Sequence, residues 1–252
     1  MTNVYIVDGA RTAFTAFGGS FAGVDAVQLG IVTAVEALKR SGVKPEQIDH
    51  VVYGGVITTG QNSAYLARHI GLYAGVPQEV PALTQNRLCG SGMQSVVTAA
   101  QQILLGEANA VLAGGAENMS QSPYSNFEQR FGGAKIGDLK FIDMLSATLT
   151  DQYTGNGMGM TAEKLAEQYS ISREEQDEFA LLSHARAAVA RDAGKFKEEI
   201  VPVTVKTRKG ELVIDTDEHI KDGGTMESLA KLRPAFKKDG TVTAANASGI
   251  ND

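Results

Sequence analysis

Short apolar runs alternate with amphipathic segments along the first half of the chain, and this alternation constrains the fold more than any other sequence feature. The runs at 4–7, 51–56 and 110–113 have the length of buried strands. Residues 24–41 and 91–105 instead carry apolar positions at helical spacing. We therefore predict a layered α/β sheet in which right-handed crossovers join the strands.

Local capping signals mark the ends of several predicted helices. Gly42 stands where the C-cap of the 24–41 helix is expected. Ser172 and Glu175 form a capping-box pattern at the start of a helix predicted at 172–193. Shorter helices are predicted at 63–73 and 161–169, and an extended segment at 82–88.

The second half of the chain has a different character. Residues 118–160 are rich in Ser, Gly, Asn, Met and aromatic residues with weak periodicity, which is typical of a functional insertion. A strand is predicted at 201–206, mostly loop at 207–240, and a strand at 241–247 that returns to the core sheet. These elements predict three parts: a core domain at 1–117, a loop domain at 118–240, and a return strand of the core at 241–252.

Composition excludes some classes of protein. A net charge of −6 argues against a nucleic-acid binder. No apolar run approaches the length of a membrane span, and the start, MTNVYIVDGART, has no pattern of a secretory signal. A single cysteine excludes an intrachain disulfide and fits a reducing compartment. We therefore predict a cytoplasmic protein without nucleic-acid or membrane partners.

The four histidines do not indicate a metal site. His50, His69, His184 and His219 show no metal-ligand spacing with one another, with the cysteine or with carboxylates. Each is interpreted as structural or exposed, and no metal is predicted. Gly114-Gly115 lacks the spacing of a dinucleotide-binding loop.

Cys89 is the strongest candidate for chemistry. An extended run enters it and a helix leaves it, so the sulfur is predicted on a tight elbow at a helix N-terminus. Unpaired N–H groups and the helix dipole favour an anion there, and the thiolate is the nucleophilic form of cysteine. Gly90 and Gly92 keep the turn narrow, and the Cys89 N–H is a candidate donor to an oxyanion. The alternative is a buried structural cysteine, and the residues alone leave both interpretations open.

At this segment the sequence resembles the thiolase family. The run Asn86-Arg87-Leu88-Cys89-Gly90-Ser91-Gly92 is similar to the family's acylation motif. Three further stretches agree in order: those that begin at Asp8 (DGART), Gly114 (GGAENMS) and Asn246 (NASGIND). The resemblance implies a thiolase-like layered α/β/α domain with an inserted loop domain, and a C-terminal half that would lie beyond Asp252.

The resemblance also implies a mechanism in which Cys89 takes the acyl group of an acyl-CoA as a thioester. The family's base for this cysteine, a His in a Gly-His-Pro motif, and its second Cys are absent from this sequence. Coenzyme A and acetyl-CoA are implied as substrates, with no permanently bound cofactor. The positions that match the family's coenzyme A contacts are Leu149, Met158, Lys221, Ser228, Ala244 and Ser248, and His184 is added because its predicted helix lies near them.

The implied activity is that of an acetyl-CoA C-acetyltransferase, with this chain alone expected to have little turnover. The run Asn156-Gly157-Met158-Gly159 lacks the His that short-chain members often carry before the Met, so a 3-ketoacyl-CoA thiolase of longer-chain β-oxidation stays open. A non-catalytic acyl-CoA-binding or partner subunit is a further alternative. A β-ketoacyl synthase relative shares the fold and the elbow cysteine, but the motif around Cys89 speaks against it. We also expect an uncovered apolar face on the 91–105 helix and a homo-oligomer, a dimer or tetramer in the full-length form.

Overall fold

The computed structural model describes residues 3–208 and 210–252. Its contacts group the chain into two compact units. The first comprises the chain up to Pro123 together with Lys197–Thr216 and Asp252. The second comprises Tyr124–Phe196 and Asp217–Asn251. The three-part domain division drawn from the sequence stays a prediction; it differs from this grouping at 118–123, 197–216 and 241–251.

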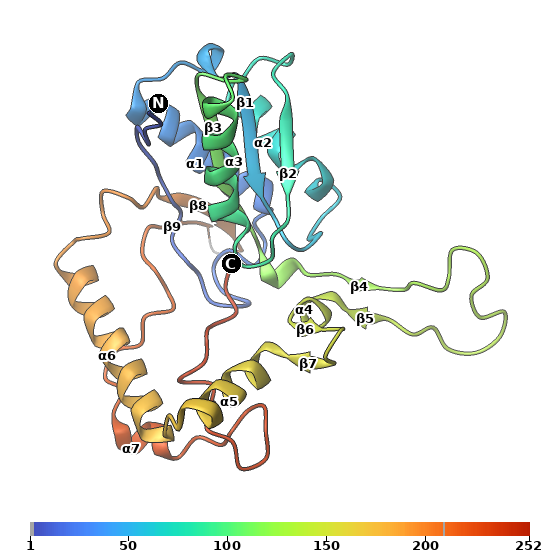
Figure 1. Cartoon of the computed structure of the whole chain (residues 1–252), viewed down its shortest axis with the longest axis vertical. Coiled ribbons are helices and arrows are strands. Elements are labelled where there is room, and N and C mark those ends of the chain that lie inside the picture. The colour runs from blue at the N-terminus through green and yellow to red at the C-terminus, as the bar shows by residue number, and fades with distance from the viewer. Residues whose placement is uncertain (1–2, 209) are drawn as a thin grey trace. The chain divides into compact units, whose positions relative to one another are not determined.

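A parallel sheet forms the centre of the first unit (Figure 1). Its strands are β1 (His50–Gly54), β2 (Ala82–Gln85) and β3 (Val111–Gly115), in the order β2-β1-β3. Both neighbours run parallel to β1. The parallel pairing confirms the α/β architecture predicted from the alternation of strands and helices.

Three helices pack on this sheet: α1 (Ala26–Ser41), α2 (Leu66–Tyr73) and α3 (Ser91–Leu104). The Asp25 carboxylate caps α1 by accepting the Val27 N–H at 2.7 Å, and Gly42 ends it in a left-handed conformation. Short 3-10 turns at Pro45–Gln47, Ser63–Tyr65 and Met119–Gln121 complete the helical elements of this unit. These helices confirm the predictions at 24–41, 63–73 and 91–105.

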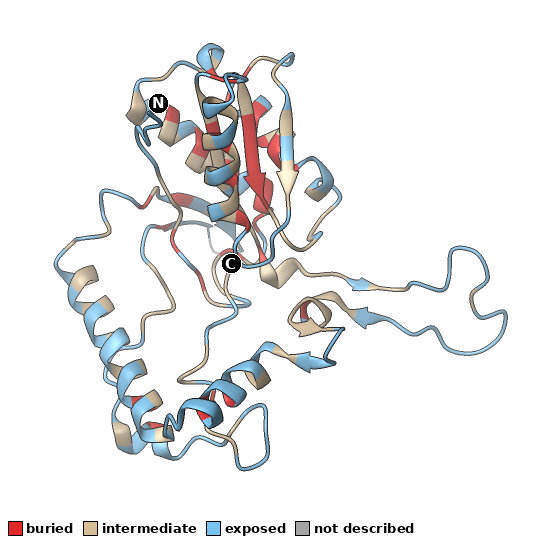
Figure 2. Cartoon of the chain, in the orientation of Figure 1, coloured by how far each residue is buried: buried red, intermediate tan, exposed pale blue. Residues whose placement is uncertain are grey.

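The apolar core lies between β1 and the pair α1 and α2. Val51 and Ile70 are among its fully buried members, and Figure 2 shows the buried residues gathered on β1 and these helices. Helix α3 turns Ser91, Ser95 and Ala99 inward and leaves its apolar outer face open. Met93, Val97 and Leu104 are 70%, 42% and 55% exposed, which confirms the predicted uncovered face.

The buried strand predicted at 4–7 is wrong. This segment forms no strand, and Tyr5, Ile6 and Val7 are 74%, 82% and 68% exposed. An apolar run is buried as a strand only when another strand supplies its backbone partners, and none of the described residues does so here. Backbone hydrogen bonding to another segment begins only after residue 7, at Arg11, whose N–H donates to the Glu199 carbonyl at 2.9 Å.

A hairpin belongs to the same unit. Strands β8 (Val203–Thr207) and β9 (Gly210–Ile214) pair antiparallel, with Val203 and Ile214 buried. The strand predicted at 201–206 is confirmed, but the 207–240 region contains β9 and a short helix where loop was predicted. Residue 209 lies outside the described part of that region.

The second unit is built from short strands and helices. The strands are β4 (Tyr124–Ser125), β5 (Ile142–Asp143), β6 (Thr150–Asp151) and β7 (Asn156–Gly157), and the helices are α4 (Met144–Thr148), α5 (Met158–Tyr169), α6 (Arg173–Asp192) and α7 (Met226–Ala230). Ser172 and Glu175 form the predicted capping box, since the Ser172 N–H reaches the Glu175 carboxylate at 2.7 Å and the Glu175 N–H reaches the Ser172 hydroxyl at 3.2 Å.

The strand predicted at 241–247 does not form, while the assignment of 241–252 to the core domain stays a prediction. Residues 241–250 form bends, turns and irregular backbone and belong to no strand of the central sheet. The Glu163 carboxylate accepts the N–H groups of Thr241 and Val242, which a ladder would otherwise use. The carboxylate of Glu163, on α5, therefore accepts the backbone N–H groups that a neighbouring strand would otherwise bind.

No helix in the described part of the chain is long and apolar enough to cross a membrane. In the same residues, no three His, Cys, Asp or Glu side chains gather as a metal site would require.

Candidate functional site

Cys89 lies on a sharp elbow between the end of β2 and the start of α3. The strand ends at Gln85 and the helix begins at Ser91. Leu88 adopts a positive φ of 50°, which is unusual for a residue with a side chain and reverses the chain just before the cysteine. The cysteine is exposed. The elbow predicted from the sequence is confirmed, and the sulfur is not sealed among packed side chains.

Two polar side chains hold the elbow in shape. The Asn86 carboxamide accepts the Leu88 N–H at 2.8 Å and donates to the Val56 carbonyl at 3.1 Å. The Ser91 hydroxyl accepts the Arg87 N–H at 2.8 Å and donates to the Leu88 carbonyl at 2.7 Å. Asn86 thus binds the N–H of Leu88 and Ser91 binds its carbonyl. These two hydrogen bonds offset the backbone strain of the positive φ at Leu88.

The elbow leaves one backbone donor available beside the sulfur. The next two N–H groups, those of Gly90 and Ser91, donate to the Arg87 and Leu88 carbonyls at 3.2 and 2.9 Å. Among the described residues, none accepts a hydrogen bond from the Cys89 N–H. A backbone donor next to a nucleophile is the arrangement that stabilises an oxyanion.

Small residues on the sheet allow the helix start to approach the strands. A Cβ at Gly54, the last residue of β1, would lie 2.4 Å from the Ser91 carbonyl carbon. A Cβ at Gly115, the last residue of β3, would lie 3.2 Å from the Gly92 Cα. The position of the elbow therefore depends on the absence of side chains at both strand ends.

Ser91→Ala is expected to lower the free energy of unfolding of the chain by about 1 kcal/mol, because it removes the buried hydroxyl that accepts the Arg87 N–H and donates to the Leu88 carbonyl. Urea unfolding measures this loss. Ser95→Ala is the matched control one helical turn on, because the Ser95 hydroxyl is equally buried but donates only to the Gly92 carbonyl of its own helix. Equal losses in the two variants would contradict a supporting role for Ser91.

Glu117 ties the next loop to the strand ends. One carboxylate oxygen accepts the N–H groups of Val56 and Ile57 at 2.8 and 3.2 Å. Burial raises the pKa of this carboxyl above its ordinary value, although the backbone N–H groups of Val56, Ile57 and Asn118 act in the opposite direction. Because Val56 also accepts from Asn86, the bonds connect Glu117 to the elbow.

Glu117→Gln is expected to raise the melting temperature at neutral pH and to change it little in acid. A carboxyl whose pKa is raised on folding favours the native state below its unfolded pKa, and that contribution is lost as pH rises through the folded pKa. The amide keeps an acceptor for Val56 and Ile57 and carries no charge to desolvate. Thermal unfolding from pH 4 to pH 8 tests this, and a lower melting temperature at pH 8 would contradict it.

The seven candidate coenzyme A residues all lie in the second unit, whereas Cys89 lies in the first. Met158 begins α5, and its N–H donates to the Leu149 carbonyl at 3.0 Å. On α6, His184 Nδ1 accepts the Lys221 N–H at 3.2 Å. The structure thus brings the candidates together as the pairs Leu149 with Met158 and His184 with Lys221.

Ser228, Ala244 and Ser248 are exposed, Ser228 on α7 and the other two on the segment 241–250. Ser228 sits in the first turn of α7, where its hydroxyl accepts the Thr225 N–H at 3.1 Å in a capping box. Ala244 and Ser248 lie in the turns that replace the predicted return strand. None of the hydrogen bonds among described residues joins these three candidates to one another.

His219 stacks on His184, with ring centroids 6.1 Å apart. Its ring also faces the Asn251 carboxamide, with His219 Nδ1 3.2 Å from Asn251 Nδ2. Burial, followed by the charges of Lys221 and His184, lowers the pKa of His219. Its imidazole is therefore favoured in the neutral form beside the two candidates.

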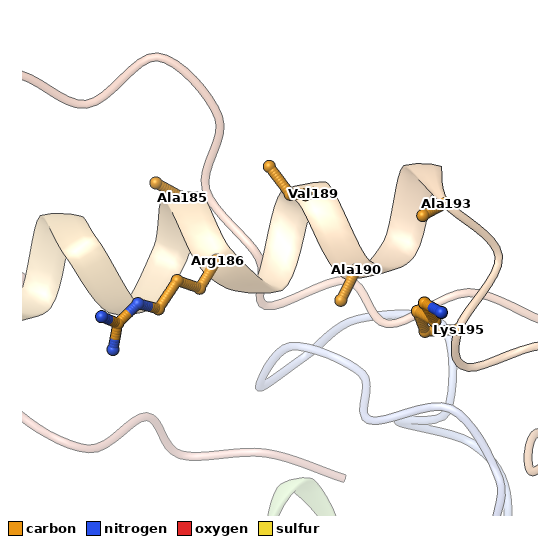
Figure 3. A pocket seen from close by; sticks show the side chains of 6 residues that line it. All are labelled: Ala185, Arg186, Val189, Ala190, Ala193 and Lys195. Atoms are coloured by element: carbon orange, nitrogen blue, oxygen red, sulfur yellow. The ribbon is translucent and has the colours of Figure 1, made fainter.

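A hollow of about 400 Å³ lies along the last turns of α6 (Figure 3). It is lined by Ala185, Arg186, Val189, Ala190, Ala193 and Lys195. The accessible lining is apolar, without the convergent polar groups that orient a ligand. It contains none of the seven candidates and forms no part of the site described here.

The comparisons with known proteins agree with this geometry. The profile described as "Thiolase, N-terminal domain" matches residues 4–252. The chain is 49% identical to a beta-ketothiolase of Cupriavidus necator over 99% of its own length, and 48% identical to the human mitochondrial 3-ketoacyl-CoA thiolase over 100%. It spans 63–64% of the length of these curated relatives.

Solved structures give the same result. The Bacillus anthracis acetyl-CoA acetyltransferase superposes with a TM-score of 0.95 at 45% identity, over 100% of this chain and 64% of that one. The human mitochondrial 3-ketoacyl-CoA thiolase in complex with CoA gives 0.92 at 47% identity, over 98% and 62%. A layered α/β domain with an exposed cysteine on a strand-to-helix elbow is the class that the fold defines. The chain belongs to the thiolase family.

Several supporting residues were not singled out from the sequence. Asn86 and Ser91 entered only as letters of a motif, and Gly54 only as one residue of the strand predicted at 51–56. An Asn two positions before a residue with positive φ is a recognisable local signal, because its side chain bonds to the backbone two residues on. Glu163 gave no such signal, since its partners lie 78 and 79 residues away.

Proposed function

We propose that this chain takes an acyl group from acyl-CoA onto the sulfur of Cys89, as the first half of a thiolase reaction. The observation that supports this most directly is the exposed sulfur at the start of α3, on an elbow fixed by Asn86 and Ser91. Family membership supplies the reaction class.

The proposed step exchanges one thioester for another. The Cys89 thiolate attacks the thioester carbonyl carbon and forms a new C–S bond, and the C–S bond to coenzyme A breaks when the tetrahedral oxyanion collapses. Coenzyme A leaves as a thiolate and takes up a proton. The Cys89 N–H is the proposed donor to the oxyanion that develops in between.

In the second half of the proposed reaction, a further acyl-CoA loses a proton from its α-carbon. This carbon attacks the acyl-enzyme, releases the Cys89 thiolate and gives a 3-ketoacyl-CoA; the reverse direction is thiolysis. The 252 residues contain neither a second cysteine nor a Gly-His-Pro motif. We therefore propose acyl capture with little turnover for the chain alone.

Coenzyme A is proposed to contact Leu149, Met158, His184, Lys221, Ser228, Ala244 and Ser248. The exposure of Met158, Lys221, Ser228, Ala244 and Ser248 supports this, because a ligand must reach them. A related structure is described as a complex with CoA. Lys221 would serve a phosphate as a point charge.

For the acyl group, we propose acetyl, as in an acetyl-CoA C-acetyltransferase. A relative with that name from Cupriavidus necator is 50% identical. The alternative is a longer 3-ketoacyl-CoA, favoured by the absence of His before Met158 and by the similarity to the human 3-ketoacyl-CoA thiolase. A non-catalytic acyl-CoA-binding or partner subunit is the alternative from a different class.

We also propose a homo-oligomer in the cytoplasm. The exposed apolar side chains of α3 support association, because monomers seldom expose contiguous apolar patches. The single cysteine, which is free, supports a reducing compartment.

Mass spectrometry after incubation with acetyl-CoA tests the proposal. The expected result is one added acetyl group on the peptide that contains Cys89, formed faster than an octanoyl group from octanoyl-CoA. Faster octanoylation would select the longer-chain alternative. Binding of coenzyme A without any acylation would select the non-catalytic subunit and contradict the enzymatic proposal.

A further inference from the structure

Two carboxylates are almost completely buried in the second unit, where most side chains are exposed. Glu163 on α5 is 4% exposed and Asp177 on α6 is 2% exposed. A buried charge is costly unless several hydrogen bonds satisfy it. Both carboxylates find these bonds in the same short segment of the chain, residues 241–246.

Glu163 takes the place of a strand partner for this segment. Its Oε1 accepts the N–H groups of Thr241 and Val242 at 3.0 and 2.9 Å. Its Oε2 accepts the N–H and the hydroxyl of Thr241 at 2.9 and 3.1 Å. Burial alone would raise the pKa of Glu163, but these N–H groups outweigh it and hold the pKa below its ordinary value.

Asp177 fixes the other end of the segment. It accepts from Arg173 Nε at 2.7 Å and from Asn246 Nδ2 at 2.9 Å. The Asn246 carboxamide oxygen in turn accepts the Thr243 N–H at 2.7 Å, which closes the turn. Arg173 also donates to the Leu229 carbonyl at 2.6 Å and so connects this network to α7.

Glu163 and Asp177 hold the chain on either side of Ala244, one of the candidate coenzyme A contacts. They bury Val242 and Thr243, which are 3% and 0% exposed, and leave Ala244 and Ser248 on the surface. Without the hydrogen bonds to Glu163 and Asp177, residues 241–248 would have no regular backbone pairing to define their path. The orientation of the two exposed residues therefore depends on carboxylates that are themselves too buried to touch a ligand.

We propose that Glu163 and Asp177 are positioning residues for coenzyme A, which hold the 241–248 turn in the conformation that presents Ala244 and Ser248. This inference rests on the proposed function. It assigns to α5 and α6 a role in binding that acts through the turn and leaves the Cys89 elbow unaffected.

Coenzyme A affinity and hydrogen exchange of the full chain test the inference together. Glu163→Gln keeps the side-chain shape but places an NH₂ group against backbone donors. The dissociation constant measured by calorimetry is expected to rise about tenfold, as the turn must be ordered on binding. Amide exchange in 241–247 should accelerate while exchange in α6 is unchanged. Asp177→Asn should give the same pattern.

Glu167→Gln is the matched control, one turn further along α5. Its side chain is 77% exposed and its ion pair with Lys237 spans 3.5 Å, so little change is expected. Alkylation of Cys89 by iodoacetamide should proceed equally in all variants, because the elbow does not involve α5 or α6.

The outcomes separate the inference from the proposed function. If the unsubstituted chain binds coenzyme A and Glu163→Gln binds it within twofold, the positioning role is overturned and the proposed function stands. If the unsubstituted chain binds no coenzyme A, both are overturned. Faster exchange throughout α5 and α6 in the variants would show general unfolding and would also overturn a specific positioning role.

Discussion

Cys89→Ser is expected to abolish acyl capture, with the rate of acetyl transfer from acetyl-CoA falling by about three orders of magnitude or more. A serine hydroxyl is a far weaker nucleophile than a thiolate and needs a base to activate it. The substitution is nearly isosteric at an exposed position, so the fold should be retained. Mass spectrometry of the Cys89 peptide over time measures the effect.

Hydroxylamine treatment provides the control for this experiment. At neutral pH it cleaves a thioester but leaves an acetylated lysine intact, so it separates the expected product from non-specific acetylation. The unsubstituted chain should lose its acetyl group and recover free Cys89. If Cys89→Ser gained a hydroxylamine-sensitive acetyl group at the original rate, the sulfur would not be the acyl carrier.

Gly54→Ala is expected to have the second largest effect. The new Cβ would lie 2.4 Å from the Ser91 carbonyl carbon and 2.7 Å from the Ser91 Cβ, so the start of α3 must move. Overpacking of this kind costs about 1–3 kcal/mol of unfolding free energy. A displacement near 1 Å at a reacting group lowers the rate by about a hundredfold, so acetylation of Cys89 should slow by one to two orders of magnitude.

Gly23→Ala is the comparison for Gly54→Ala. It lies in the same unit with no atom within 4 Å of its new Cβ, and it should change stability by less than about 0.5 kcal/mol. Urea unfolding and the rate of Cys89 acetylation should both be measured on each variant. A Gly54→Ala chain that acetylates as fast as Gly23→Ala would contradict the view that strand-end packing sets the elbow.

Local signals in the sequence were enough to predict the longer helices and the strands of the central sheet. Gly42 and the Ser172–Glu175 box mark helix ends through bonds made within a few residues. The elbow at Cys89 was predictable for the same reason, because a strand period changes to a helix period there. Helix α7 was missed because it is one short turn with Ser228 in place of Glu or Gln in its capping box.

The errors share a different cause. Residues 4–7 have the apolar composition of a buried strand, yet burial depends on a partner elsewhere in the chain. Residues 241–247 have the pattern of a strand, but their backbone bonds go to Glu163 and Asn246. Contacts between positions 78 residues apart produce no periodic pattern in the sequence. The 241–248 turn and the carboxylates of Glu163 and Asp177 that hold it therefore could not be predicted from one sequence.

The two units will respond to different variables of the solution. The first has an apolar cluster around β1, which gains strength from sulfate and weakens on cooling. The second relies on charged contacts such as Arg173–Asp177 and Arg191–Asp222, and its more exposed pairs are screened by simple salts. If the second unit binds coenzyme A as proposed, sodium chloride should weaken that binding before it alters the reactivity of the thiol, so buffer composition would adjust recognition and chemistry independently.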